Sequence, residues 1–259
     1  MESDMVETSP TVTVSDSAAV VIGGTSGIGR AIALAFADDG ADVVATSRSA
    51  DAVEETAEEL RDRGAKTAEV TCDVRDDESI ENLYEVASDA IGDVDILVNS
   101  AGSVARASVS EMSDDQWSQD IDVNLTGVFR ACRVFGREME SGSIVNISSM
   151  SARQAREERP AYCAAKSGVN GLTRAAAADL APDVRVNAIE PGFVNTPLAG
   201  DGFNEGTELR KKIDEGTPME RVATPDEIAG AAVYLASDAA SFTTGAVITV
   251  DGGYNDNAL

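Results

Sequence analysis

Residues 18–40 read AAVVIGGTSGIGRAIALAFADDG, and this stretch decides the fold. It opens with a continuous apolar run typical of a strand buried on both faces, passes through a glycine-rich turn at residues 23–29 and continues as an apolar helix. The glycines permit a tight turn and close approach of the backbone, so that N–H groups at the helix start can face a pyrophosphate. Their spacing is GxxxGxG rather than the commoner GxGxxG. A plain turn is the alternative, but the position after a first strand favours a dinucleotide site.

The same alternation of strand and helix patterns continues along the chain. Continuous apolar, β-branched runs are separated by helical patterns of about 10 to 20 residues. Such an order indicates a parallel sheet with helices on both faces. We therefore predict an α/β protein: a single Rossmann-type doubly wound domain at residues 17–259, with an approximately seven-stranded parallel sheet, preceded by a disordered acidic leader at residues 1–16. After the first, the strand-like runs occupy residues 41–47, 66–74, 93–102, 142–149, 184–192 and 246–253.

The net charge of −26, from 46 acidic and 20 basic residues, argues against nucleic acid or an anionic membrane as a partner. The acidic residues are spread along the chain, as at residues 38–39, 76–77 and 157–158. This distribution favours a solvated acidic surface typical of halophiles over an acidic interaction surface. No apolar run is long enough to span a membrane, and the N-terminal residues lack the basic and apolar regions of a signal peptide. A cytoplasmic location is therefore expected.

Histidine is absent from the sequence. This excludes Ser-His-Asp and Cys-His hydrolysis, HExxH zinc chemistry and any histidine general base. Cys72, Cys132 and Cys163 are odd in number and far apart, so we predict no metal site and no disulfide framework, but buried thiols in a reducing compartment. Proton transfer is left to tyrosine, lysine, cysteine or carboxylates.

The segment PAYCAAKSG at residues 160–168 places Lys166, one of only four lysines, four residues after Tyr162. On a helix these side chains share one face, and the small residues between them let that face approach a ligand closely. A tyrosine with its ordinary pKa near 10 is a poor base at neutral pH, but a neighbouring ammonium favours the phenolate. The pair is thus a candidate acid–base device, with a plain surface pair as the alternative.

The end of the second strand bears on the choice of dinucleotide. An acidic residue there typically holds the ribose hydroxyls of NAD, whereas an arginine suits the extra phosphate of NADP. This chain has Ser47 and Arg48 at that place, which favours NADP(H) and leaves NAD(H) open, since the arginine could equally be a solvated residue at a helix start. Asp73 and Val74 end the third run and are predicted to lie beside the adenine; the alternative for Asp73 is a cap on the next helix.

Seven short motifs stand in order along the chain: GGTSGIG at 23–29, NSAG at 99–102, VNLTG at 123–127, SIVNISS at 143–149, YCAAK at 162–166, PGFVNT at 191–196 and VDGG at 250–253. Each alone is a weak signal. In this order, at strand ends and in the expected helices, they resemble the short-chain dehydrogenase/reductase family in its single-domain form, over residues 18–254. Ile22 and Ser100 depart from the threonine and second asparagine that are usual in the family, which bears on cofactor affinity rather than on the chemistry.

The resemblance implies a nicotinamide cofactor and an active site of Asn124, Ser149, Tyr162 and Lys166. Ser149 is chosen over Ser148 because the family's serine stands about 13 residues before its tyrosine. Tyr162 would exchange a proton with the substrate and Ser149 would polarise the same oxygen. Lys166 would hold ribose hydroxyls, and Asn124 would anchor a water that links Lys166 to solvent. The remaining cofactor residues would be Gly23, Thr25, Ser26, Gly27, Ile28, Gly29, Asn99, Ala101, Gly102, Pro191, Gly192, Val194 and Thr196.

The expected activity is NAD(P)(H)-dependent interconversion of a ketone and a secondary alcohol by hydride transfer, on a small-molecule substrate. A 3-oxoacyl thioester is slightly favoured, because Arg153, Arg156 and Arg159 could meet an anionic group. Gln154 could instead serve a sugar or polyol, and pairing of the arginines with the glutamates at 157–158 is a further alternative. A non-catalytic dinucleotide-binding redox sensor, and a lyase or epimerase on the same fold, are the rival functions.

Three further segments are assigned by their pattern. Residues 198–218 are predicted to form a mobile flap over the pocket. The helices at 117–138 and 162–180 have more apolar surface than one sheet should bury. By resemblance they would pair with copies of themselves in a homotetramer, with residues 250–259 at a second interface.

Overall fold

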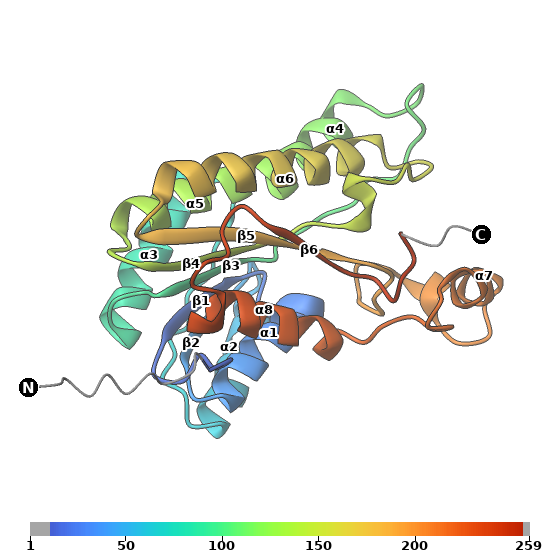
Figure 1. Cartoon of the computed structure of the whole chain (residues 1–259). Coiled ribbons are helices and arrows are strands. Elements are labelled where there is room, and N and C mark those ends of the chain that lie inside the picture. The colour runs from blue at the N-terminus through green and yellow to red at the C-terminus, as the bar shows by residue number, and fades with distance from the viewer. Residues whose placement is uncertain (1–10, 256–259) are drawn as a thin grey trace, which may run out of the picture.

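Six parallel strands form one sheet in the computed structural model of the chain, which describes residues 11–255. The strands lie in the order β2-β1-β3-β4-β5-β6, so the order reverses between β1 and β3 (Figure 1). Valine and isoleucine dominate these runs and pack well on a pleated surface buried on both faces. The predicted doubly wound α/β fold is confirmed. The strands are β1 (Ala18–Ile22), β2 (Asp42–Thr46), β3 (Ile96–Asn99), β4 (Gly142–Ile147), β5 (Val184–Pro191) and β6 (Val247–Val250).

The predicted run at residues 66–74 does not form a seventh strand. It lies beside β2, where the Val43 N–H donates to the Lys66 carbonyl and the Cys72 N–H donates to the Ser47 carbonyl, both over 3.0 Å. A parallel ladder needs evenly spaced bonds along its length, and this segment makes them only near its two ends. The segment nevertheless lies along the edge of β2. The sheet therefore has six strands, and the predicted seventh is an extended segment beside it.

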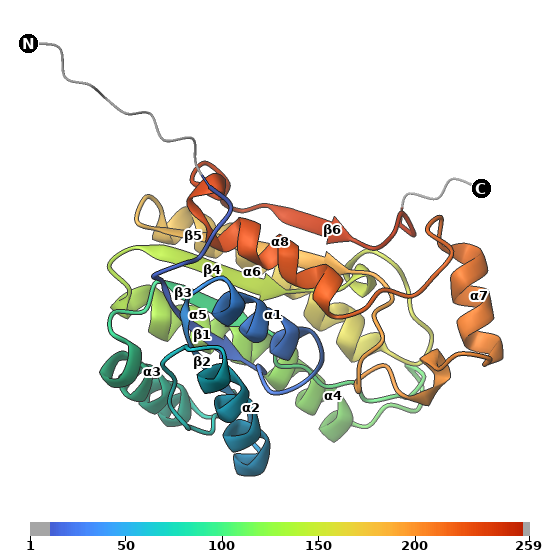
Figure 2. The same ribbon diagram turned by 90° about the horizontal axis from the view of Figure 1, so that it is seen from below.

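Helices cover both faces of the sheet, as Figures 1 and 2 show. One face carries α1, α2 and α8, and the other carries α3, α5 and α6. A short π-helical turn, Asp122–Thr126, joins α4 to α5. The helices are α1 (Gly27–Asp38), α2 (Ala50–Asp62), α3 (Asp77–Ile91), α4 (Asp114–Ile121), α5 (Gly127–Glu138), α6 (Pro160–Leu180), α7 (Glu208–Gly216) and α8 (Asp226–Ala236).

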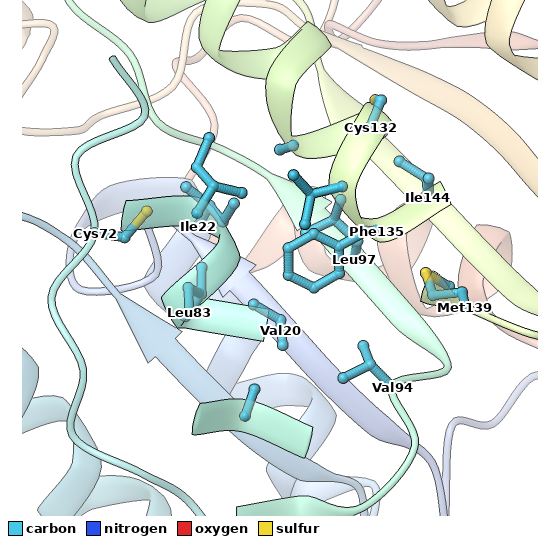
Figure 3. Close-up of a cluster of buried hydrophobic side chains, with 14 of the residues drawn as sticks. Val20, Ile22, Cys72, Leu83, Val94, Leu97, Cys132, Phe135, Met139 and Ile144 are labelled. Atoms are coloured by element: carbon cyan, nitrogen blue, oxygen red, sulfur yellow. The ribbon is translucent and has the colours of Figure 1, made fainter. Parts of the chain in front are cut away.

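Two apolar layers separate the sheet from its helices. Alternate residues of β1 face opposite layers, with Val20 and Ile22 in the layer beneath α3, α5 and α6, and Ala19 and Val21 in the layer beneath α1 and α8. Figure 3 shows the first layer, where the ring of Phe135 lies among strand side chains. Burying one such ring stabilises the fold by roughly 1.5 to 3 kcal/mol. The strands are thus held on both faces.

Residues 13–16 are held against the end of α1. Val14 is 2% exposed, and its N–H donates to the Asp39 carboxylate over 2.6 Å. The Thr13 hydroxyl donates to the same carboxylate over 2.9 Å. Packing therefore begins a few residues before position 17, where the domain was predicted to start. Of the predicted leader, residues 1–10 lie outside the described residues.

The carboxyl ends of the six strands meet at one edge of the sheet because all the strands are parallel. Open α/β sheets bind ligands at this edge, where the strand order reverses. Here the strand order reverses between the paired neighbours β1 and β3. After β5 the chain leaves the sheet and forms α7, which lies within the predicted flap (Figure 2). The fold therefore places the glycine turn, the serine motif and the flap around one space.

Candidate active site

A pocket of about 360 Å³ opens at this edge. Its wall is built by the turns that follow the first five strands of the chain, and by the start of α6. Segments far apart in the sequence therefore share one cavity. Sixteen of the predicted site residues line it: Gly23, Thr25, Ser26, Gly27, Ile28, Ser47, Arg48, Ala101, Gly102, Ser149, Tyr162, Lys166, Pro191, Gly192, Val194 and Thr196.

The glycine turn forms a cradle that leaves no room for side chains. Gly23 has a φ of +77°, and a Cβ there would stand 2.5 Å from the Ala101 nitrogen. A Cβ on Gly29 would collide with the Gly23 carbonyl oxygen. Ser26 precedes α1 without a side-chain cap, whereas the serine before α2 caps its helix. The first N–H groups of α1 thus stay available to a phosphate, which fits a dinucleotide pyrophosphate.

Tyr162 and Ser149 both line this pocket. Tyr162 is 8% exposed, and burial raises the pKa of its hydroxyl, while a hydrogen bond with Ser149 and the charge of Arg159 act to lower it. The Ser149 oxygen also accepts the Ser151 N–H over 3.1 Å, which orients it. The neighbouring Ser148 donates instead to the Lys166 carbonyl over 3.3 Å. Both serines line the pocket, and the contact of Ser149 with Tyr162 distinguishes it from Ser148.

Lys166 lies one helical turn after Tyr162 and is 4% exposed. Its Nζ donates to the Ile147 carbonyl over 2.8 Å and lies 5.7 Å from the centre of the Tyr162 ring. Burial lowers the pKa of Lys166 to about 8, with the charge of Asp120 acting in the opposite direction. The amine thus lies beside the tyrosine ring, and its role towards the phenolate and the ribose stays a prediction.

Asn124 is fully buried in the π-helical turn and does not line the pocket. Its Nδ2 donates to the main-chain carbonyls of Asp120 and Ser103, each over 2.9 Å. Its Oδ1 accepts the Ser103 N–H over 3.3 Å. Such π turns interrupt the regular helical ladder and are frequent at functional sites. The side chain thereby ties the segment after β3 to the junction of α4 and α5, and its water-anchoring role stays a prediction.

The predicted adenine end lies in a second, smaller pocket of about 80 Å³, which shares Arg48 and Gly102 with the first. Asp73 and Val74 line it. The Asp73 carboxylate pairs with Arg75 over 2.6 Å, and hydrogen bonds from Arg75 lower the pKa of Asp73 to about 2. Asp73 does not cap the next helix, because Asp76 is the residue that caps α3. The two pockets adjoin at Arg48 and Gly102, an arrangement that would fit an elongated ligand such as a dinucleotide.

Asn99 and Gly29 do not line either pocket. The Asn99 amide points into the core and donates to Asn146 over 2.9 Å, so it supports the ends of β3 and β4. The sequence did not single out several of the lining residues as site residues. Three of them belong to the predicted flap, and Ser100 was noted only as a departure from the family pattern. The missed residues are Ser100, Val104, Ile147, Ser148, Met150, Ser151, Phe193, Pro197, Leu198, Ala199 and Phe203.

The three arginines after the serine motif have different surroundings. Arg153 pairs over 2.8 Å with Glu190, which is fully buried at the end of β5. Arg156 and Arg159 line the pocket and make no ion pair among residues 11–255. The alternative of surface pairing with the glutamates at 157–158 is therefore wrong for all three. Of the three arginines, only Arg156 and Arg159 remain candidates for binding an anionic group of a substrate.

Cys72 and Cys132 are buried and Cys163 is partly buried, and all three thiols are free. Burial raises the pKa of Cys72 to about 11 and that of Cys132 to about 12, so neither is a ready nucleophile. No group of side chains in residues 11–255 is arranged to hold a metal ion. Within the same residues, no helix has the length and apolar character to cross a membrane.

Known proteins are similar to this chain both in sequence and in structure. The family model described as enoyl-(acyl carrier protein) reductase matches residues 22–255. D-Threitol dehydrogenase of Mycolicibacterium smegmatis is 42% identical, over 91% of this chain and 92% of its own. Cis-4-hydroxycyclohexanecarboxylate dehydrogenase of Sinomonas cyclohexanicum is 39% identical, over 91% and 95%. A 3-oxoacyl-[acyl-carrier-protein] reductase of Chlamydia muridarum is 36% identical, over 91% and 96%.

Solved structures agree with these relatives. A Beutenbergia cavernae protein, provisionally described as an NAD(P)-dependent gluconate 5-dehydrogenase and holding NADP at low occupancy, superposes with a TM-score of 0.89. It is 41% identical, with 95% of this chain and 99% of that chain covered. A short-chain type dehydrogenase/reductase from Mycobacterium marinum superposes with a TM-score of 0.88 at 32% identity, covering 94% and 97%. The chain therefore belongs to the short-chain dehydrogenase/reductase family, whose members here are oxidoreductases acting on alcohol and ketone groups.

Proposed function

We propose that the protein interconverts a ketone and a secondary alcohol, with Tyr162 as the group that exchanges the proton. The observation that carries this proposal is the convergence of Tyr162, Ser149 and Lys166 on the pocket formed by the glycine turn. A nicotinamide cofactor, when bound, supplies the hydride chemistry. The cradle of Gly23, Gly29 and the uncapped start of α1 would hold its pyrophosphate.

Three side chains would carry out proton transfer, stabilise the substrate oxygen and bind the ribose. In the reductive direction the Tyr162 hydroxyl donates its proton to the substrate oxygen, and in the oxidative direction the phenolate accepts it. Ser149 donates a hydrogen bond to that same oxygen and stabilises the charge that develops on it. Lys166 favours the phenolate through its positive charge and would bind ribose hydroxyls. Purified protein mixed with either reduced cofactor and a panel of ketones should oxidise the cofactor; bound cofactor without turnover would contradict the proposal.

Replacing Ser149 with alanine should lower kcat by about 10²-fold and move the pH profile of alcohol oxidation towards higher pH. The hydrogen bond from Ser149 lowers the pKa of Tyr162, so its loss raises that pKa, and the phenolate then forms only at higher pH. Initial rates between about pH 6 and pH 10 would measure the shift. Ser143→Ala is the matched control, because Ser143 lies on β4, the strand that precedes Ser149, outside the pocket, and its hydroxyl donates to the Leu235 carbonyl over 3.0 Å. An unshifted profile in Ser149→Ala would contradict the proposed role.

For the cofactor we propose a preference for NADP(H) over NAD(H). Arg48 lies at the junction of the two pockets, is exposed, and makes no ion pair among the described residues. An exposed guanidinium without a carboxylate partner can bind the extra phosphate of NADP. The similar protein that holds NADP at low occupancy lends support.

Arg48→Ala should lower the ratio of kcat/KM for NADPH to that for NADH by roughly 10- to 100-fold, the range expected for a charge-assisted hydrogen bond. Steady-state kinetics with both cofactors at one ionic strength would measure the ratio. Arg63→Ala is a suitable control, because Arg63 follows α2 and pairs with Asp38. An unchanged ratio in Arg48→Ala would refute the assigned preference.

For the substrate we propose a small hydroxylated compound of the polyol or sugar-acid class, with a 3-oxoacyl thioester as the second candidate. The sequence slightly favoured the thioester because of three arginines, but Arg153 is occupied by Glu190. Relatives of both kinds occur, the D-threitol dehydrogenase being 42% identical and the acyl-carrier-protein reductase 36% identical. Turnover of a polyol panel compared with 3-oxoacyl thioesters would distinguish the two candidates.

We also propose a homotetramer in the cytoplasm of a salt-accumulating organism. Trp117 of α4 and Phe129 of α5 are each 44% exposed, and β6 lies at an open edge of the sheet. The charge of −26 supports the high-salt setting. The predicted second interface lies partly in residues 256–259, outside the described residues. Light scattering in concentrated KCl should give a mass about four times that of the chain; a monomer mass would contradict the proposal.

A further inference from the structure

The charge of the pocket is opposite to that of the chain. Acidic residues outnumber basic ones by 46 to 20 in the sequence. Among the described residues, no aspartate or glutamate lines the main pocket, whereas Arg48, Arg156, Arg159 and Lys166 do. Buried or half-buried cations without counter-ions are unfavourable unless a ligand supplies the negative charge. The pocket is therefore built for an anionic occupant.

The cofactor accounts for only part of this charge. Arg48 lies at the end shared with the adenine pocket, and Lys166 belongs to the catalytic group. Arg156 and Arg159 come from the segment between the serine motif and α6, on the side where Met150 and Phe193 line the pocket. These two arginines are thus left for the substrate.

Arg159 stands directly before α6, three residues ahead of Tyr162. It is half-buried, and burial lowers the pKa of its guanidinium, as do the nearby charges of Arg106 and Arg156. The first turn of α6 also has no side-chain cap, so its N–H groups add positive potential. An anion held here would be close to the hydroxyl of Tyr162, and so to the reacting carbon.

Arg156 is held in place by aromatic rings. Its guanidinium carbon lies 4.6 Å from the centre of the Phe193 ring and 5.6 Å from that of Tyr254. The two rings contact each other edge to face, with centroids 4.9 Å apart. Stacking of this kind fixes a guanidinium without neutralising it. Arg156 is therefore pre-positioned and still able to bind an oxyanion.

Arg106 extends the same positive region. The Ala107 N–H donates to the Glu158 carbonyl over 3.0 Å, which sets the segment containing Arg106 beside the one containing Arg156 and Arg159. None of these three arginines makes an ion pair within residues 11–255, although ten of the 16 arginines do. In a chain so rich in carboxylates, three neighbouring unpaired arginines, one of them three residues before Tyr162, favour an anionic ligand.

We infer that the substrate carries a carboxylate near its reacting carbon, and that Arg159 and Arg156 bind this carboxylate. The inference rests on the proposed hydride-transfer function. Two guanidinium groups can bind both oxygens of a carboxylate through charge-assisted hydrogen bonds. The phosphate of an acyl carrier is separated from its thioester by the whole pantetheine arm, so it would not lie beside Tyr162. A hydroxy acid or an oxo acid fits better than a thioester or a neutral polyol.

Matched substrate pairs test this inference. 3-Hydroxybutanoate is compared with 3-hydroxybutanamide, which has nearly the same shape and no charge, and the four-carbon sugar acid D-threonate with its neutral alditol, D-threitol. Wild-type protein should show at least about a tenfold higher kcat/KM for the acid of a pair that it turns over. In Arg159→Gln and Arg156→Gln the ratio of acid to neutral compound should fall by roughly 10- to 100-fold.

The ratio of kcat/KM for the acid to that for the neutral compound separates recognition of the charge from any change in the pKa of Tyr162. Loss of Arg159 changes that pKa equally for both members of a pair. Arg174→Gln is the matched control, because Arg174 lies on the same helix, is exposed and has no ion pair among the described residues. Equal turnover of acid and neutral compound by wild type, or an unchanged ratio in Arg159→Gln, would overturn the inference and leave the proposed function standing. No turnover of any pair with either cofactor would count against the proposed function itself.

Discussion

Tyr162→Phe is expected to lower kcat by about 10³-fold in both directions, because it removes the one hydroxyl that can exchange a proton with the substrate oxygen. Histidine is absent from the sequence, and the thiols of Cys72 and Cys132 have raised pKa values. No carboxylate among the described residues lines the pocket. The chain therefore has no evident substitute for the tyrosine.

The fold and cofactor binding should survive this change. The Tyr162 ring is 8% exposed, and phenylalanine keeps that ring and its packing on α6. NADPH affinity, measured by fluorescence titration, should stay within a few-fold of wild type. Tyr84→Phe is a matched control, because the Tyr84 hydroxyl donates to the Glu138 carbonyl away from the pocket. Turnover by Tyr162→Phe near the wild-type rate would show that another group transfers the proton.

Lys166→Arg is expected to lose most activity, about 10²-fold or more, although the positive charge is kept. Lys166 is 4% exposed and its Nζ reaches the Ile147 carbonyl over 2.8 Å. The guanidinium is bulkier and planar, so it cannot occupy the place of the ammonium without displacing Tyr162 or the ribose. The loss thus comes from misplacement of the charge rather than from its absence.

Circular dichroism and thermal melting should show that the Lys166→Arg variant is folded. Lys211→Arg is the control, since Lys211 lies on α7 with its side chain 69% exposed. Comparison with Lys166→Met separates the two contributions: removal of the charge should raise the pH at which alcohol oxidation begins. Near-normal turnover of Lys166→Arg would refute the role assigned to the lysine.

The sheet and the cofactor cradle could be predicted because their causes are local in the sequence. Alternating apolar runs and amphipathic helices indicate strands and helices whatever lies next to them. The glycine turn depends on close approach and positive φ, which only glycine tolerates, as at Gly23. The pairing of Tyr162 with Lys166 follows from helix periodicity.

The failures have non-local causes. Residues 66–74 have the composition of a strand but make ladder bonds only near their ends, which depends on how the segment meets β2. Asn99 belongs to a recognised motif, yet its side chain turns to Asn146 because the two strand ends are adjacent. The partner of Arg153 is Glu190, 37 positions away in the chain, so neighbouring residues in the sequence could not indicate that pairing.

By itself the sequence determined the doubly wound fold, the tight glycine turn and the placing of Tyr162 and Lys166 on one face of a helix, since each depends on residues within a few positions of one another. Only the tertiary structure decided which charges remain unpaired in the pocket. Arg156 and Arg159 line the pocket and Arg106 lies close to Arg159, while Arg153 pairs with a buried carboxylate. The physical reason is that net charge is a sum along the chain, whereas recognition depends on which charges the folded backbone places together, and which it leaves without a partner.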